Sequence, residues 1–131
     1  MHEWRDHTAE VELVIDAASP EEVFVEAAAA FAELAAGAGE RGSEPQTREV
    51  RLEARDRASL LVDWLEELIY LADTDGFVPR GVQIQLADAS LEGRVYGVVG
   101  SVDPLVKAAT YHGLAFEERE GRWHAHVVLD V

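Results

Sequence analysis

The sequence of 131 residues contains no cysteine and only one methionine. Disulfide bonds, and zinc or iron–sulfur centres held by cysteine, are therefore excluded. The sequence also lacks an apolar signal segment at its start and any apolar run near the roughly 20 residues that a membrane helix needs. We therefore expect a single cytoplasmic domain spanning residues 1–131, with no membrane partner, since this length suits one globular core.

Basic side chains are scarce as well: 11 Lys and Arg residues stand against 26 Asp and Glu residues, for a formal net charge of -15 at pH 7. The acidic residues are spread along the chain, which predicts a soluble, self-repelling surface. Strong nucleic-acid binding depends on Lys and Arg side chains that neutralise phosphates. We therefore expect no DNA partner, and any RNA role should run through a partner protein or a metal ion.

Two segments have the start signals and the apolar spacing of helices. In the first, Ser19 can cap the helix, Pro20 suits the first helical position and Glu22 can complete a capping box. The second begins after a plausible cap at Asp56. Small residues dominate the apolar face of the first helix and bulky residues that of the second. The expected helix-to-sheet core consists of Phe24, Phe31, Trp64, Leu65, Leu68 and Ile69.

Strands are predicted where apolar and polar residues alternate with a period of two. This pattern occurs near residues 10–16 and 46–54, and the chain after Gly76 turns wholly to strands. Those later strands are expected near residues 82–86, 91–99, 108–118 and 123–131. The order of elements predicts an α+β fold, with two helices packed on one face of a mixed or antiparallel β-sheet in a single-domain two-layer sandwich.

The segment Asp73-Thr74-Asp75-Gly76 has the composition of a calcium loop. With Gly76 at the glycine position of an EF-hand, however, the first and last ligand positions would be Leu71 and Val82, which cannot bind calcium. A C-terminal helix cap is therefore the better interpretation of this segment.

A second candidate metal motif lies in the last predicted strand. His124 and His126 project from one face of it, and Asp130 would share that face. This geometry suits a transition metal such as zinc, although exposed histidines on a sheet are more common than metal pairs. The sequence contains no nucleophile elbow, no Gly-rich phosphate loop and no HExxH motif, so residue patterns alone predict no enzyme.

Polar residues flank the predicted strands in three segments, residues 6–10, 106–113 and 129–131. Each has a simple structural interpretation. His7 and Thr8 could form a turn, and Glu10 could be a solvated strand residue. Lys107 could be a surface charge, and Asp130 could belong to a frayed terminus.

Four segments, in this order, resemble the motifs of the archease family. They are His7-Thr8-Ala9-Glu10-Val11, Trp64-Leu65-Glu66-Glu67-Leu68-Ile69-Tyr70, Val106-Lys107-Ala108-Ala109-Thr110-Tyr111-His112 and Asp130-Val131. The similarity covers nearly the whole chain. It implies a cytosolic α+β accessory protein that activates an RtcB-type RNA ligase, promoting its guanylylation and multiple turnover in tRNA splicing or RNA repair. In that picture the protein does not itself catalyse ligation, and it reaches RNA only through the ligase.

The resemblance also implies a site. It places a divalent metal ion on Glu10, Asp130 and the main-chain carbonyl of Val131, and a functional contact on Lys107, with no catalytic residue. Oxygen ligands of this kind suit calcium, magnesium or manganese. Glu10 stands where the family has Asp, and the segment between Gly100 and Lys107 is shorter than the family's loop.

Two other functions are weighed against this one. A metal-dependent hydrolase or nuclease would need further ligands near Glu10 and Asp130, with His112, His124 or His126 as the obvious recruits. A chaperone-like interaction domain would instead show an exposed apolar patch and no defined metal site.

Overall fold

The structure is a computed structural model that describes residues 1–7, 10–37, 41–101 and 106–131. Within these ranges the elements, in chain order, are β1 (His2–His7), β2 (Glu10–Ala17), α1 (Pro20–Gly37), β3 (Arg41–Glu53), α2 (Arg57–Asp75), β4 (Phe77–Ala87), β5 (Ser90–Ser101), β6 (Ala108–Arg119) and β7 (Arg122–Asp130). The predicted α+β class is confirmed. None of the described helices is long and apolar enough to cross a membrane.

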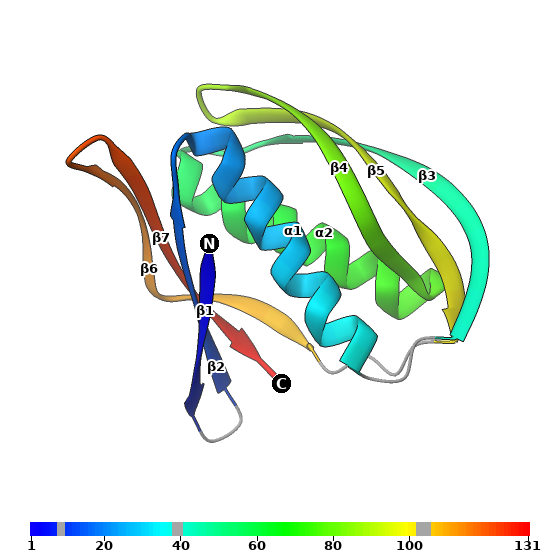
Figure 1. The fold of residues 1–131 in the computed structure, drawn as a ribbon. Helices are drawn as coiled ribbons and strands as arrows, with labels where there is room; N and C mark the ends of the chain where they lie inside the picture. Colours follow the sequence, from blue (N-terminus) through cyan, green and yellow to red (C-terminus); the bar gives the residue numbers. More distant parts are fainter. Residues whose placement is uncertain (8–9, 38–40, 102–105) are drawn as a thin grey trace.

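The strands form two antiparallel sheets where the sequence predicted one. A four-stranded sheet has the order β1-β2-β7-β6, and a three-stranded sheet has the order β3-β5-β4. Both helices contact strands of both sheets, and Figure 1 shows them inside the curve of the three-stranded sheet with the four-stranded sheet beside them. Alternation predicts that a segment is a strand but carries no information about its partner, which is why the division was not foreseen.

The helix starts follow from local hydrogen bonds. Ser19 Oγ accepts the backbone N–H of Glu22 at 3.3 Å, and Glu22 Oε2 accepts the backbone N–H of Ala18 at 3.3 Å. The predicted capping box therefore forms, with its return bond one residue before the cap. At the start of α2, Asp56 Oδ1 accepts the backbone N–H of Ser59 at 2.8 Å. This bond lowers the pKa of Asp56 below its usual value.

Gly76 ends α2 in the left-handed conformation, with φ at 67°, and its N–H donates to Ala72 O at 3.0 Å. The interpretation of residues 73–76 as a helix cap is therefore confirmed. A Cβ atom at this position would lie 2.0 Å from Gly100 O, so β5 also approaches too closely for any other residue.

The core lies between the two sheets and is built around α2. The ring of Trp64 is fully buried, and its Nε1 donates to Phe24 O at 3.0 Å, which ties the two helices together. All six predicted core residues are buried. The two helices and both sheets therefore contribute to one apolar core.

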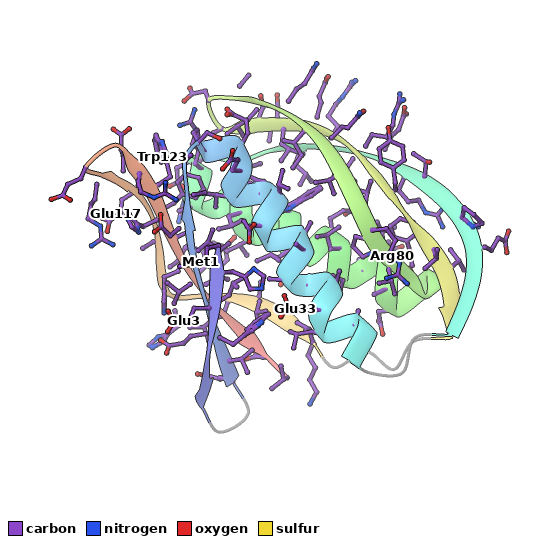
Figure 2. All side chains as sticks on the ribbon, in the orientation of Figure 1. Met1, Glu3, Glu33, Arg80, Glu117 and Trp123 are labelled. Carbon is purple, nitrogen blue, oxygen red and sulfur yellow. The ribbon has the colours of Figure 1, made fainter. Side chains whose placement is uncertain are left out.

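β1 is an element that the sequence did not predict. This strand lacks a clear alternation of apolar and polar residues, because the side chains that contact α1 are His2 and Trp4, which both carry polar groups. The two ring nitrogens of His2 contact Glu26 Oε2 at 2.8 Å and Glu33 Oε2 at 2.6 Å, and Figure 2 shows Glu33 on the side of α1 near β1. Both partners are acceptors, so the imidazole can donate to both only when it is doubly protonated.

Candidate functional site

The strand register brings the two predicted carboxylates together. Glu10, the first residue of β2, lies directly opposite Asp130, the last residue of β7. Opposite residues of antiparallel neighbours project from the same face, with Cβ atoms about 4.5–5.5 Å apart. Residues 120 positions apart in the sequence therefore share one corner of the four-stranded sheet.

β6 brings Lys107 to the same corner. Ala108 lies opposite Asp130 on its other side, and the backbone N–H of Lys107 donates to Asp130 O at 2.8 Å. The Lys107 side chain is exposed, and Val131 follows Asp130 directly and is half-buried. We refer to Glu10, Lys107, Asp130 and Val131 as the Asp130 corner.

The carboxylates of the Asp130 corner lie on the outer face of the sheet, away from the helices. Leu13 and Ile15 of β2 are fully buried, so the alternate residues of this strand project outward. The outward set of β2 includes Glu10, Glu12 and Asp16. At the far end of this face, Arg122 donates to Asp16 Oδ1 at 2.6 Å, and this bond lowers the pKa of Asp16 below its usual value.

The sequence matches known proteins over nearly its full length. The model of the Archease protein family matches residues 2–131. The chain belongs to the archease family. It is 35% identical to the protein archease of Methanosarcina mazei, over 99% of this chain and 95% of that one. It is 32% identical to the protein archease of Methanopyrus kandleri, over 96% of each chain.

Two solved structures share the archease fold. The solution structure of protein 1598 from Methanobacterium thermoautotrophicum has a TM-score of 0.72 and 30% identity, covering 99% of this chain and 98% of that one. The crystal structure of an archease and possible chaperone from Thermotoga maritima has a TM-score of 0.71, covering 100% of this chain and 98% of that one. Its 22% identity means that this second likeness shows the fold alone.

The histidine pair of this archease is placed as the alternation predicted, on the same face as Asp130. His126, however, already contacts two acceptors: its Nε2 lies 2.8 Å from Glu12 Oε1 and its Nδ1 lies 2.6 Å from Gly113 O. Both ring nitrogens of His126 are therefore already engaged with protein oxygen atoms, and a metal ion could bind the ring only by displacing one of these contacts. Across the described ranges, no three His, Asp or Glu side chains are grouped to hold a metal ion.

The remaining residues of the archease motifs are placed as follows. The backbone of His7 pairs with Glu10, whereas Thr8 lies outside the described residues. Tyr111 and His112 are exposed on an irregular stretch of β6, where the register with β7 shifts between Thr110 and Ala115. Neither therefore contributes to the apolar core.

The donor set of the Asp130 corner suits a hard cation. Two opposed carboxylates and a following main-chain carbonyl offer only oxygen atoms, which calcium, magnesium and manganese prefer. Zinc sites in proteins usually contain histidine or cysteine. The residues on this face therefore fit the ions that the family resemblance implies.

Sequence reasoning missed one polar residue beside the corner, Glu66 of α2. Its Oε1 accepts the backbone N–H of Ala109 at 3.0 Å, two residues after Lys107. Glu66 belongs to the segment of residues 64–70 that resembles the archease helix signature, so the motif itself was the available signal. No local pattern shows that this side chain reaches a strand 43 residues further along the chain.

Proposed function

We propose that this archease family member is an accessory protein that activates an RtcB-type RNA ligase. It would promote guanylylation of the ligase and multiple turnover in tRNA splicing or RNA repair, without catalysing ligation. The observation that supports the proposal is the pairing of β2 with β7, which sets Glu10 opposite Asp130 beside Lys107. These are the residues on which the family resemblance places the metal ion and the functional contact.

In this proposal the carboxylates of Glu10 and Asp130 and the carbonyl of Val131 hold calcium, magnesium or manganese. The ion supplies positive charge between two carboxylates that otherwise repel each other. Glu10 is one methylene longer than the Asp of the family, and its longer side chain still carries the same ligand group. The corner thereby becomes a charged surface of defined geometry at the edge of an acidic protein.

Lys107 acts as the contact group in the proposal. It is the only lysine in the chain, its side chain is exposed, and its backbone N–H is bonded to Asp130 O. Lysine carries a compact ammonium group that suits a phosphate or an acidic patch. Because the net charge of -15 disfavours direct binding of RNA, the partner surface is assigned to the ligase.

The test is multiple-turnover RNA joining with GTP by the ligase of the same organism. Lys107→Ala and Asp130→Ala should each abolish stimulation while the circular dichroism spectrum stays that of the parent. Arg51→Ala and Glu92→Ala are matched controls, because these exposed residues form an ion pair on the other sheet. Absence of stimulation by the folded parent would reject the proposal.

A chaperone-like interaction domain is the second candidate function. Its support is the exposure of two large aromatic side chains, Tyr70 and Tyr111, which are 60% and 56% exposed. The two candidates differ in their need for metal. If the parent acts on a partner equally well after chelation, and Asp130→Ala does the same, the interaction domain is favoured.

A further inference from the structure

The start of β6 is held on two sides. On one side, the backbone N–H of Lys107 donates to Asp130 O of β7 at 2.8 Å. On the other side, the backbone N–H of Ala109 donates to Glu66 Oε1 of α2 at 3.0 Å. Val106 and Ala109 are only 5% and 7% exposed, so the exposed Lys107 lies between two buried residues.

The Glu66 carboxylate accepts a backbone N–H of the edge strand β6, as a neighbouring strand would do inside a sheet. β6 is at the edge of the four-stranded sheet as described, and α2 packs against it. An edge strand carries outward N–H groups that no neighbouring strand accepts. A carboxylate that accepts such a group forms a charge-assisted hydrogen bond, roughly twice as strong as a neutral one. Glu66 also follows the fully buried Leu65, so it projects from a well-packed part of α2.

We propose that Glu66 is a positioning residue that holds the start of β6 so that Lys107 is presented beside Asp130. The inference rests on the proposed function, in which Lys107 is the contact group of the Asp130 corner. Glu66 would act through the backbone of Ala109 and would not itself touch the ligase. Its role is therefore to reduce the number of positions that the Lys107 ammonium group samples.

The first measurement is residue-level amide hydrogen exchange. Glu66→Ala should speed the exchange of the Ala109 amide by about tenfold or more, since a bond to a charged acceptor is lost. Glu66→Gln keeps an acceptor oxygen and should show a smaller change. Glu67→Ala is the matched control, because Glu67 is the next residue of α2, is half-buried too, and its side chain makes no hydrogen bond or ion pair with the described residues. Unchanged Ala109 exchange in both Glu66 variants would overturn the proposal.

The second measurement uses the single lysine. Reductive methylation with carbon-13 formaldehyde keeps the positive charge and labels Lys107 and the α-amino group, and Lys107→Arg assigns the two signals. In Glu66→Ala the Lys107 signal should narrow and move toward that of an unfolded peptide, whereas Glu66→Gln and Glu67→Ala should resemble the parent. An unchanged Lys107 signal in Glu66→Ala would also overturn the proposal. If Glu66→Ala does not fold, Ala109 exchange is compared between Glu66→Gln and Glu67→Ala. The proposal requires faster exchange in Glu66→Gln than in Glu67→Ala, and equal rates would overturn it.

Ligase stimulation separates this inference from the proposed function. Glu66→Ala should raise the concentration needed for half-maximal stimulation by about tenfold, with rescue by Glu66→Gln. If the parent does not stimulate the ligase, the proposed function is wrong. Amide exchange at Ala109 and the signal of methylated Lys107 still test whether Glu66 positions Lys107. If the parent stimulates and Glu66→Ala stimulates equally well despite a released Lys107, the positioning inference is wrong and the proposed function stands.

Discussion

The outer faces of the two sheets differ in which charged residues lie opposite each other on neighbouring strands. On the three-stranded sheet, charges of opposite sign lie across from each other: Arg94 contacts Glu49 at 3.3 Å, and Arg51 contacts Glu92 at 3.1 Å. Figure 2 shows nitrogen-tipped and oxygen-tipped side chains along the outside of this sheet. On the four-stranded sheet, Glu10 lies directly opposite Asp130, a pair of like charges.

Like charges directly opposite each other destabilise a sheet, whereas opposite charges stabilise it. Two other carboxylates of the four-stranded face have partners among the side chains: Asp16 pairs with the cationic Arg122, and Glu12 contacts the His126 ring. The described residues offer no such partner to Glu10 or Asp130. Charges directly opposite each other on the three-stranded sheet therefore offset each other, whereas Glu10 and Asp130 repel each other and an external cation between them would reduce that repulsion.

The largest expected effect concerns the core that supports both faces. Trp64→Ala removes a fully buried ring between the two sheets and should lower the free energy of unfolding by about 3–5 kcal/mol. Chemical denaturation followed by circular dichroism measures the change. Tyr70→Ala, on the exposed side of the same helix, should change stability by no more than about 0.5 kcal/mol. Equal losses in the two variants would mean that α2 does not support the sheets in this way.

The second effect is stabilisation by a divalent ion, which should depend on the four-stranded sheet and not on the three-stranded one. A divalent ion at one hundred times its dissociation constant should stabilise the parent by about 2.7 kcal/mol. Glu10→Gln should lose this response and, in metal-free buffer, should be slightly more stable than the parent because the repulsion is gone. Thermal melts with calcium, magnesium, manganese and a chelator provide the measurement. Glu92→Gln, on the three-stranded sheet, should keep the full stabilisation by the ion. If both variants lost that stabilisation, the ion would not be specific to the Asp130 corner.

A third effect concerns the irregular stretch of β6. Gly113 has φ at +66°, and a Cβ atom there would lie 3.2 Å from Cε1 of His126. Gly113→Ala should cost more than the roughly 1–2 kcal/mol expected for a left-handed residue alone. Gly121→Ala is the control, since Gly121 has φ at +78° but nothing within 4 Å of its added Cβ. The difference between their unfolding free energies measures the contact with His126, and equal losses would show that the ring adjusts freely.

The smallest effect is a pH dependence at β1, the edge strand. A hydrogen bond with His2 holds the pKa of Glu26 below its ordinary value of 4.5. The stability that this carboxylate contributes is therefore present above about pH 4.5 and is lost as the pH falls through the lowered pKa. Acid titration of the parent and of Glu26→Gln measures it. The two stability curves should differ near neutral pH and converge in acid; parallel curves would contradict the prediction.

Local signals explain why much of the fold was predictable. The start of α1 depends on Ser19 and Glu22, and the start of α2 depends on Asp56 and Ser59, so each signal lies within four residues of sequence. Strands with one buried face show a period of two. β1 escaped notice because its inward residues His2 and Trp4 are half-polar, and their partners Glu26 and Glu33 lie on α1.

The site was predictable only in part. The family motifs singled out Glu10, Lys107 and Asp130, and the register then set Glu10 opposite Asp130. Metal binding at these residues and contact with a ligase stay predictions. Glu66 was visible in a motif, but its contact with Ala109 was not, because a helix signature says nothing about what its polar side chains reach.

The sequence by itself determined the helices, most of the strands, the composition of the core and the residues worth testing. The tertiary structure alone decided which strands pair, how the strands divide into two sheets and which polar groups meet. The bond from Glu66 to Ala109 spans 43 residues, and the contact between Glu12 and His126 spans 114. Such contacts depend on a register that packing of the whole buried face establishes, so no short segment of the chain encodes them.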